Sequence, residues 1–323
     1  MGADRRLNLA PMMERTDRHF RFLLRLITRR TRLYSEMVVD RTLIHGDPPR
    51  HLDFHPAEHP VALQIGSAEP RLAARAVAIA RGWGYDEVNL NVGCPSPRAQ
   101  AGGFGVVLMR RPERVAEIVR AVYGETGVRL SIKHRTGVDE LAGEAFLARF
   151  VEEVAGAGAR VFIVHARKAW TQGLDPKANR EVPPLEHEAV YRLKRTFPEL
   201  TIVTNGGIRS PEEVRAHLAH VDGAMVGRAM WDRPWRWAEA DRLLWGEPHA
   251  PERRAVLERY QAYLEDRLAE GTPLRPLLRP LFNLFKGERG GRRWRQALDA
   301  ALRAGRLPPG GLVALAPLEE VGS

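Results

Sequence analysis

Eight short runs rich in β-branched and apolar residues recur before residue 230, and this pattern constrains the fold more than any other feature. Amphipathic stretches separate most of these runs; one of them, 71–84, ends in glycine, and another, 210–221, begins with serine and proline. Strands that alternate with helices form a parallel sheet, and eight such units are typical of a closed (β/α)8 barrel. The expected strands are 7–12, 33–38, 61–66, 87–93, 129–135, 161–167, 201–207 and 223–228.

Two segments depart from this alternation. Residues 40–60, between the second and third expected strands, show little helical pattern and are expected to be loop. From about residue 236 the chain reads as helices only, rich in Leu, Ala and Arg. The sequence therefore predicts an α/β protein with a TIM-barrel catalytic domain at 1–240 and a small all-helical domain at 241–323. Its last residues, 307–323, are expected to be a frayed tail.

Charge and cysteine content narrow the class of protein. The net charge is +10, and residues 253–306 are dense in Arg and Lys, which favours a polyanion such as nucleic acid as partner. An Arg-rich composition alone could also produce this surplus, so charge leaves both readings open. A single cysteine cannot form an intramolecular disulfide, and no apolar run is long enough to span a membrane. The cytoplasm is the expected compartment.

Polar residues recur at the carboxyl ends of the expected strands. In (β/α)8 barrels the active site lies at that end, and eight independent packing accidents are a poor explanation for the pattern. These residues are Met12, Gln64, Asn91, Cys94, Lys133, His165, Asn205 and Arg228.

Two glycine-containing segments, NGGI at 205–208 and VGRAM at 226–230, end the seventh and eighth strands. Their backbone N–H groups can face a phosphate, although glycines can also serve only to form a tight turn. Lys133 within a buried strand suits an anion or an electron-rich ring, so the set favours FMN. The sequence has no GxGxxG fingerprint after the first strand and no metal-ligand spacing.

The only cysteine, Cys94, lies in NLNVGCPSPRAQAGGFG at 89–105, just past the fourth strand. It can be a small buried hydrophobe or a reactive group on a loop, and the local sequence leaves both open. A cysteine beside a cofactor can give a proton to a carbon that receives a hydride on its other face.

Taken in order, the motifs resemble those of the tRNA-dihydrouridine synthases over residues 7–295. The segments that carry the resemblance are APM, ALQIG, NLNVGCPS, GGFG, TNGGI and VGRA. KHRTG, HARKAW and KANREVPPL are similar to the A subfamily, and RPLFNLFKGERGGRRWR at 279–295 is similar to its tRNA-binding helices.

The resemblance implies a flavoenzyme in which NADPH reduces FMN, which then passes a hydride to C6 of a tRNA uracil, while Cys94 protonates C5. The substrates implied are the D-loop uridines 20 and 20a. The implied FMN contacts are Pro11, Met12, Gln64, Lys133, His165, Asn205, Gly206, Gly207, Gly227 and Arg228. The tRNA contacts expected are Asn91, Arg98, Lys177, Asn179, Arg180 and Arg279.

Two other functions are compatible with part of the sequence. A small-molecule FMN oxidoreductase would share the barrel and the flavin, but it leaves the basic helical end unexplained. A non-catalytic RNA-binding protein would explain the charge but not the set of Cys94, Lys133 and His165. We expect the tRNA-modifying enzyme, acting as a monomer with no stable protein partner and no metal.

Overall fold

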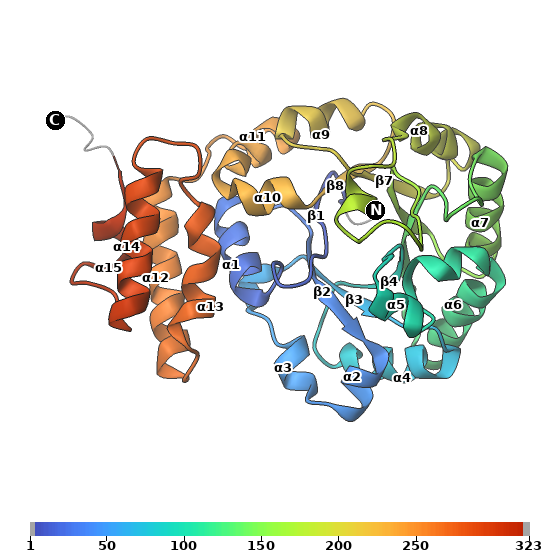
Figure 1. Cartoon of the computed structure of the whole chain (residues 1–323), viewed down its shortest axis with the longest axis horizontal. Coiled ribbons are helices and arrows are strands. Elements are labelled where there is room, and N and C mark those ends of the chain that lie inside the picture. The colour runs from blue at the N-terminus through green and yellow to red at the C-terminus, as the bar shows by residue number, and fades with distance from the viewer. Residues whose placement is uncertain (1–3, 319–323) are drawn as a thin grey trace.

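The computed structural model describes residues 4–318, and its centre is a sheet of eight parallel strands (Figure 1). Each strand overlaps an expected run, so the predicted strands and the (β/α)8 class are confirmed. The strands are β1 Leu7–Leu9, β2 Leu33–Val39, β3 Val61–Gly66, β4 Glu87–Val92, β5 Ser131–Arg135, β6 Val161–His165, β7 Thr201–Asn205 and β8 Gly223–Val226.

The sheet curves into a barrel in the order β1-β8-β7-β6-β5-β4-β3-β2. Between β1 and β2 it closes through Arg32, whose N–H donates to Leu7 C=O at 3.0 Å and whose C=O accepts from Leu9 N–H at 2.8 Å. The register pairs Asn91 with Lys133 and His165 with Asn205. Neighbouring strands therefore end in polar residues at the same level of the barrel.

Helices cover the outside of the barrel. The expected helices at 71–84 and 210–221 are present, and Ser210 caps the second by accepting from Glu213 N–H at 3.3 Å. The barrel helices are α1 Arg18–Ile27, α2 Asp40–His45, α3 Pro48–Leu52, α4 Pro70–Arg81, α5 Pro97–Ala101, α6 Pro112–Thr126, α7 Glu144–Gly156, α8 His187–Thr196, α9 Pro211–His217, α10 Arg228–Asp232 and α11 Ala240–Trp245.

The connection at 40–60 differs from the expected loop. It contains α2, α3 and a 3-10 turn at Pro56–Glu58, and α2 packs against α4 as a barrel helix. Each piece is no longer than six residues, which is too short to show a helical period in the sequence.

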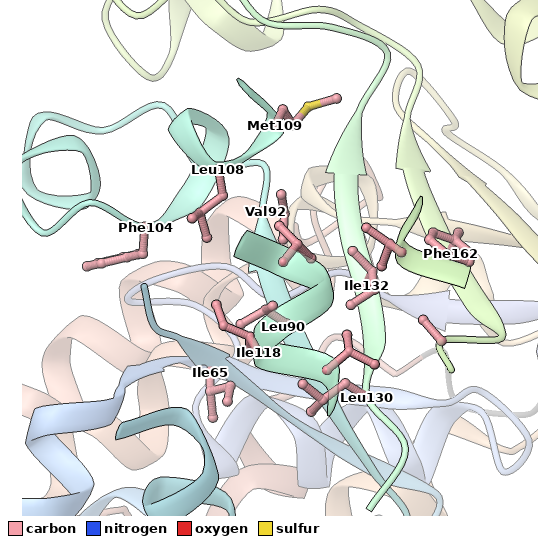
Figure 2. Packing of buried hydrophobic residues seen from close by; sticks show 14 of the residues in the cluster. Ile65, Leu90, Val92, Phe104, Leu108, Met109, Ile118, Leu130, Ile132 and Phe162 are labelled. Carbon is pink, nitrogen blue, oxygen red and sulfur yellow. The ribbon is translucent and has the colours of Figure 1, made fainter. Parts of the chain in front are cut away.

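Apolar side chains fill the space between the strands and the outer helices. Figure 2 shows Ile65, Leu90 and Ile132 from neighbouring strands close to Ile118 of α6, all of them fully buried. Burial of each such side chain stabilises the fold by about 1.5–3 kcal/mol. This packing fixes the strands, and so the side chains at their carboxyl ends.

The helical end of the chain forms a bundle beside the barrel (Figure 1), made of α12 Arg253–Ala269, α13 Leu274–Leu278, α14 Gly291–Ala304 and α15 Gly311–Leu315. Phe22 and Leu26 of α1 share an apolar cluster with Leu257 and Tyr260 of α12. Helix α1 therefore joins the bundle to the barrel.

The expected frayed tail is wrong for residues 307–318. Helix α15 packs against α12, Leu312 is fully buried, and Gln261 accepts a hydrogen bond from Leu312 N–H at 2.6 Å. The prolines and glycines of this segment indicated a loop, although the short apolar stretch GLVAL forms a helix that completes the bundle core. Residues 319–323 of the expected tail lie outside the described part of the chain.

Candidate active site

A cavity of about 2060 Å³ opens at the carboxyl ends of the strands. Its wall contains fourteen arginines and lysines but six carboxylates, so it favours an anionic ligand. All the residues expected to hold FMN line it, and so does Cys94. They are Pro11, Met12, Gln64, Lys133, His165, Asn205, Gly206, Gly207, Gly227 and Arg228.

Lys133 is a partly buried basic residue of the cavity wall. Its Nζ donates to Asn205 Oδ1 at 3.1 Å, and Asn205 Nδ2 in turn donates to Met225 C=O at 2.7 Å. Burial, with Arg135 nearby, lowers the pKa of Lys133 to about 7. Burial, together with Arg135 and Lys133, holds the pKa of His165 well below its ordinary value. The site thus offers a neutral imidazole and a lysine that titrates near neutral pH.

The glycine turn after β7 approaches His165 closely. Gly206 has φ +116°, and a Cβ on it would lie 2.8 Å from Cδ2 of His165. Gly207 also has a positive φ, +73°. Glycine is favoured at both positions, because their backbone conformation and the packed side chains leave little room for a Cβ. Across the mouth, Arg228 forms an ion pair with Glu181 at 2.6 Å.

The loop that carries Cys94 is held by Asn91. Asn91 Oδ1 accepts the N–H groups of Gly93 at 3.1 Å and of Cys94 at 2.9 Å. Cys94 Sγ donates to Ser96 Oγ at 3.3 Å. Gly105, with φ +77°, packs so closely that a Cβ would lie 2.4 Å from the Cys94 carbonyl oxygen. The thiol is half-buried and shares the cavity wall with Lys133 and Arg135.

The residues expected to contact tRNA are divided between the cavity and its surroundings. Asn91, Arg98 and Arg180 line the cavity. Lys177 is exposed on the same loop as Arg180 but does not line the cavity. Arg279 is half-buried, with its guanidinium carbon 5.5 Å from the ring centroid of Trp231.

Asn179 differs from the expectation of a tRNA contact because its side chain is fully buried. Its Oδ1 accepts from Trp170 N–H at 2.7 Å, and its Nδ2 donates to the carbonyls of Trp170 at 2.9 Å and Leu174 at 3.0 Å. The amide closes the loop that presents Lys177 and Arg180. Asn179 is therefore a positioning residue.

The sequence prediction missed Arg135, which is buried at the cavity wall. Its Nε donates to Gly93 C=O at 2.9 Å, and its Nη1 donates to the carbonyls of Lys168 at 3.2 Å and Asn179 at 3.0 Å. It ties the cysteine loop to the loop after β6. Its position in β5, two residues after Lys133 and on the same face, was the available signal. The other basic wall residues that the sequence prediction missed are Arg15, Arg18, Arg21, Arg50, Arg167, Arg209, Arg233, Arg236 and Lys286.

A (β/α)8 barrel with a basic cavity, a lysine on a buried strand and a glycine turn at its strand ends has the features of the active site of an enzyme. Comparison with known families identifies which one. The chain belongs to the dihydrouridine synthase family, since the sequence model described as Dihydrouridine synthase (Dus) matches residues 8–307. The family that the motifs predicted is confirmed.

Several relatives have the name tRNA-dihydrouridine(20/20a) synthase. The protein from Synechocystis sp. is 47% identical over 304 residues, covering 94% of this chain and 91% of that protein. The one from Xanthomonas axonopodis pv. citri is 49% identical over 298 residues, 92% and 89% of the two chains. The one from Escherichia coli is 45% identical over 296 residues, 91% and 86%.

Among solved structures, a 2-naphthoyl-CoA reductase complex is similar in fold, with a TM-score of 0.54 at 10% identity. The similarity covers 75% of this chain and 50% of that one, and it supports the barrel alone. Within residues 4–318, no helix is long and apolar enough to cross a membrane.

Proposed function

We propose that this chain is a tRNA-dihydrouridine synthase that reduces the C5=C6 bond of D-loop uridines 20 and 20a. Relatives that align with nine-tenths of the chain have this name. The observation that carries the proposal is the placement of Cys94, the only cysteine, on the wall of the cavity that also contains Lys133 and His165.

Enzymes of this family are flavin-dependent oxidoreductases, and the cavity wall fits FMN. The open glycine turn of Gly206 and Gly207, with Gly227 and Arg228 on the next loop, is suited to the phosphate. Lys133, Gln64 and His165 offer polar atoms to a flat heterocycle deeper in the barrel, and Pro11 and Met12 offer an apolar surface. A Cβ at Gly206 would lie 2.8 Å from the ring of His165, so the turn packs directly against another residue of the cavity wall.

Bound FMN, reduced by NADPH, supplies the hydride that C6 of the uracil receives. The chain itself supplies the proton: the S–H bond of Cys94 breaks and a C–H bond forms at C5. The thiolate that remains lies on the cavity wall that Lys133 and Arg135 also line. Asn91 orients the loop and offers an amide to the base, which must leave its stack to reach the cavity.

The tRNA backbone would be held by Arg98 and Arg180, which line the cavity, together with Lys177 and Arg279, which do not. We propose the division of labour that the sequence predicts, with the barrel at 1–240 as the catalytic domain and the helical domain at 241–323 as a tRNA-binding unit. The enzyme would act in the cytoplasm as a monomer, one copy on each tRNA.

The test is to purify the protein, record its visible spectrum, and incubate it with NADPH and unmodified tRNA while mapping dihydrouridine by position. A flavin spectrum with reduction confined to the D-loop is the expected result. Flavin present with tRNA left unmodified would indicate a small-molecule oxidoreductase instead. Binding of tRNA by a protein that holds no flavin would indicate a non-catalytic RNA-binding protein.

A further inference from the structure

A continuous chain of buried hydrogen bonds runs from the interior of the barrel to the cysteine loop. Glu87 Oε1 accepts from the hydroxyl of Ser131, and Ser131 Oγ accepts from Asn89 Nδ2 at 2.8 Å. Asn89 Oδ1 accepts from Gln64 Nε2 at 2.8 Å. Toward the cavity, the hydrogen-bond chain continues from Gln64 to Asn91, whose Nδ2 donates to Gln64 Oε1 at 2.8 Å.

Both ends of the chain impose one direction on it. The Glu87 carboxylate forms an ion pair with Arg5 at 2.7 Å, and a carboxylate can only accept hydrogen bonds. The N–H groups of Gly93 and Cys94, at the other end, can only donate. An amide turned the other way would place donor against donor and acceptor against acceptor in a buried site.

We propose that Asn89 and Ser131 are positioning residues that fix which atoms Gln64 and Asn91 present to the cavity. Asn91 Oδ1 already accepts two N–H groups, so its unused polar group is one N–H of Nδ2. Gln64 likewise keeps one N–H of Nε2 outside the chain. Both amides therefore offer donors, and the ligand atoms that they select are acceptors such as the carbonyl oxygens of a flavin or of a uracil.

Neither positioning residue contacts the ligand in this arrangement. Asn89 is fully buried and Ser131 is 2% exposed, and neither lines the cavity. Their effect on binding must pass through Gln64 and Asn91. The inference concerns the same site as the proposed function and rests on it for the identity of the ligand. The direction of the hydrogen-bond chain does not depend on the proposed function.

The test uses Ser131→Ala, which removes only the hydroxyl between Glu87 and Asn89, and Asn89→Leu, which removes the acceptor of Gln64. Ser67→Ala is the matched control. Ser67 is also a buried serine that donates to a buried carboxylate, that of Asp40, but neither residue belongs to the hydrogen-bond chain. Ser131→Thr keeps the hydroxyl and should restore the wild-type values within twofold. A buried hydrogen bond is worth about a 2- to 12-fold change in an equilibrium constant.

Two measurements are made on each variant of the full chain. The first is hydrogen exchange at the amides of Gly93 and Cys94 in flavin-free protein, and the second is the FMN dissociation constant. We expect the exchange rate and the FMN dissociation constant each to rise about threefold in Ser131→Ala and about tenfold in Asn89→Leu. Neither quantity should change in Ser67→Ala. Ser131→Ala alone decides the question if Asn89→Leu does not fold.

Equal values for Ser131→Ala and Ser67→Ala would overturn the inference, and so would a failure of Ser131→Thr to restore them. The exchange measurement needs no flavin. A wild-type protein that binds no FMN would therefore refute the proposed function, while the exchange rates would still decide whether the chain positions the loop.

Discussion

Replacing Gly206 with alanine tests whether the turn after β7 forms the flavin cradle, and Gly158 provides a matched control. Both glycines have φ +116°, where an alanine costs about 1–3 kcal/mol of stability. Their surroundings differ. A Cβ on Gly158 would meet only Nη1 of Arg129, at 3.7 Å, whereas a Cβ on Gly206 would lie 2.8 Å from the ring of His165.

Both variants should therefore lose stability in chemical denaturation, Gly206→Ala at least as much as Gly158→Ala, but only Gly206→Ala should lose flavin binding. Gly206→Ala must displace His165 or the turn, so we expect its FMN dissociation constant to rise at least tenfold, about 1.4 kcal/mol. Gly158→Ala should bind FMN as the wild type does. Equal FMN affinity in the two folded variants would refute the assignment of the turn to the cofactor.

Three further outcomes are expected. Arg180→Ala should weaken tRNA binding and lower the slope of log affinity against log salt concentration by about one, while NADPH-driven flavin reduction stays intact. Slower flavin reduction would place Arg180 in the flavin site. Lys133 has a pKa of about 7 folded and 10.5 unfolded, so the unfolded chain binds more protons between these values. In urea unfolding of the flavin-free proteins, the free energy of unfolding of the wild type should therefore rise from pH 7 to 10 relative to that of Lys133→Met. Parallel plots of unfolding free energy against pH for the two proteins would contradict this. Leu312→Ala should lose about 2–5 kcal/mol of unfolding free energy, because Leu312 of α15 is buried in the bundle core. A loss below about 0.5 kcal/mol would mean that the tail is not packed.

The barrel could be predicted from the sequence because its signals are local and repeated. Most strands are short runs rich in β-branched and apolar residues, such as VALQIG in β3, and the strand ends carry the polar residues that line the cavity. The parallel topology follows from the alternation, which in turn places Gln64, Lys133 and His165 at one end.

Other features depend on contacts between residues far apart in the chain. Asn179 reads as part of a charged surface loop, yet the structure buries it in hydrogen bonds to Trp170 and Leu174. Arg135 reads as one more basic residue, although it joins two loops through three backbone carbonyls. The roles of these residues depend on loop packing, which has no local sequence period.

The single measurement that tests the central claim most directly compares wild type and Cys94→Ala for dihydrouridine formation in unmodified tRNA. Both proteins are loaded with flavin and supplied with NADPH. The account predicts that Cys94→Ala binds FMN and tRNA as the wild type does but loses most of its turnover, because no other thiol exists in the chain to protonate C5. Full turnover in this variant would contradict the role of Cys94 as the proton donor.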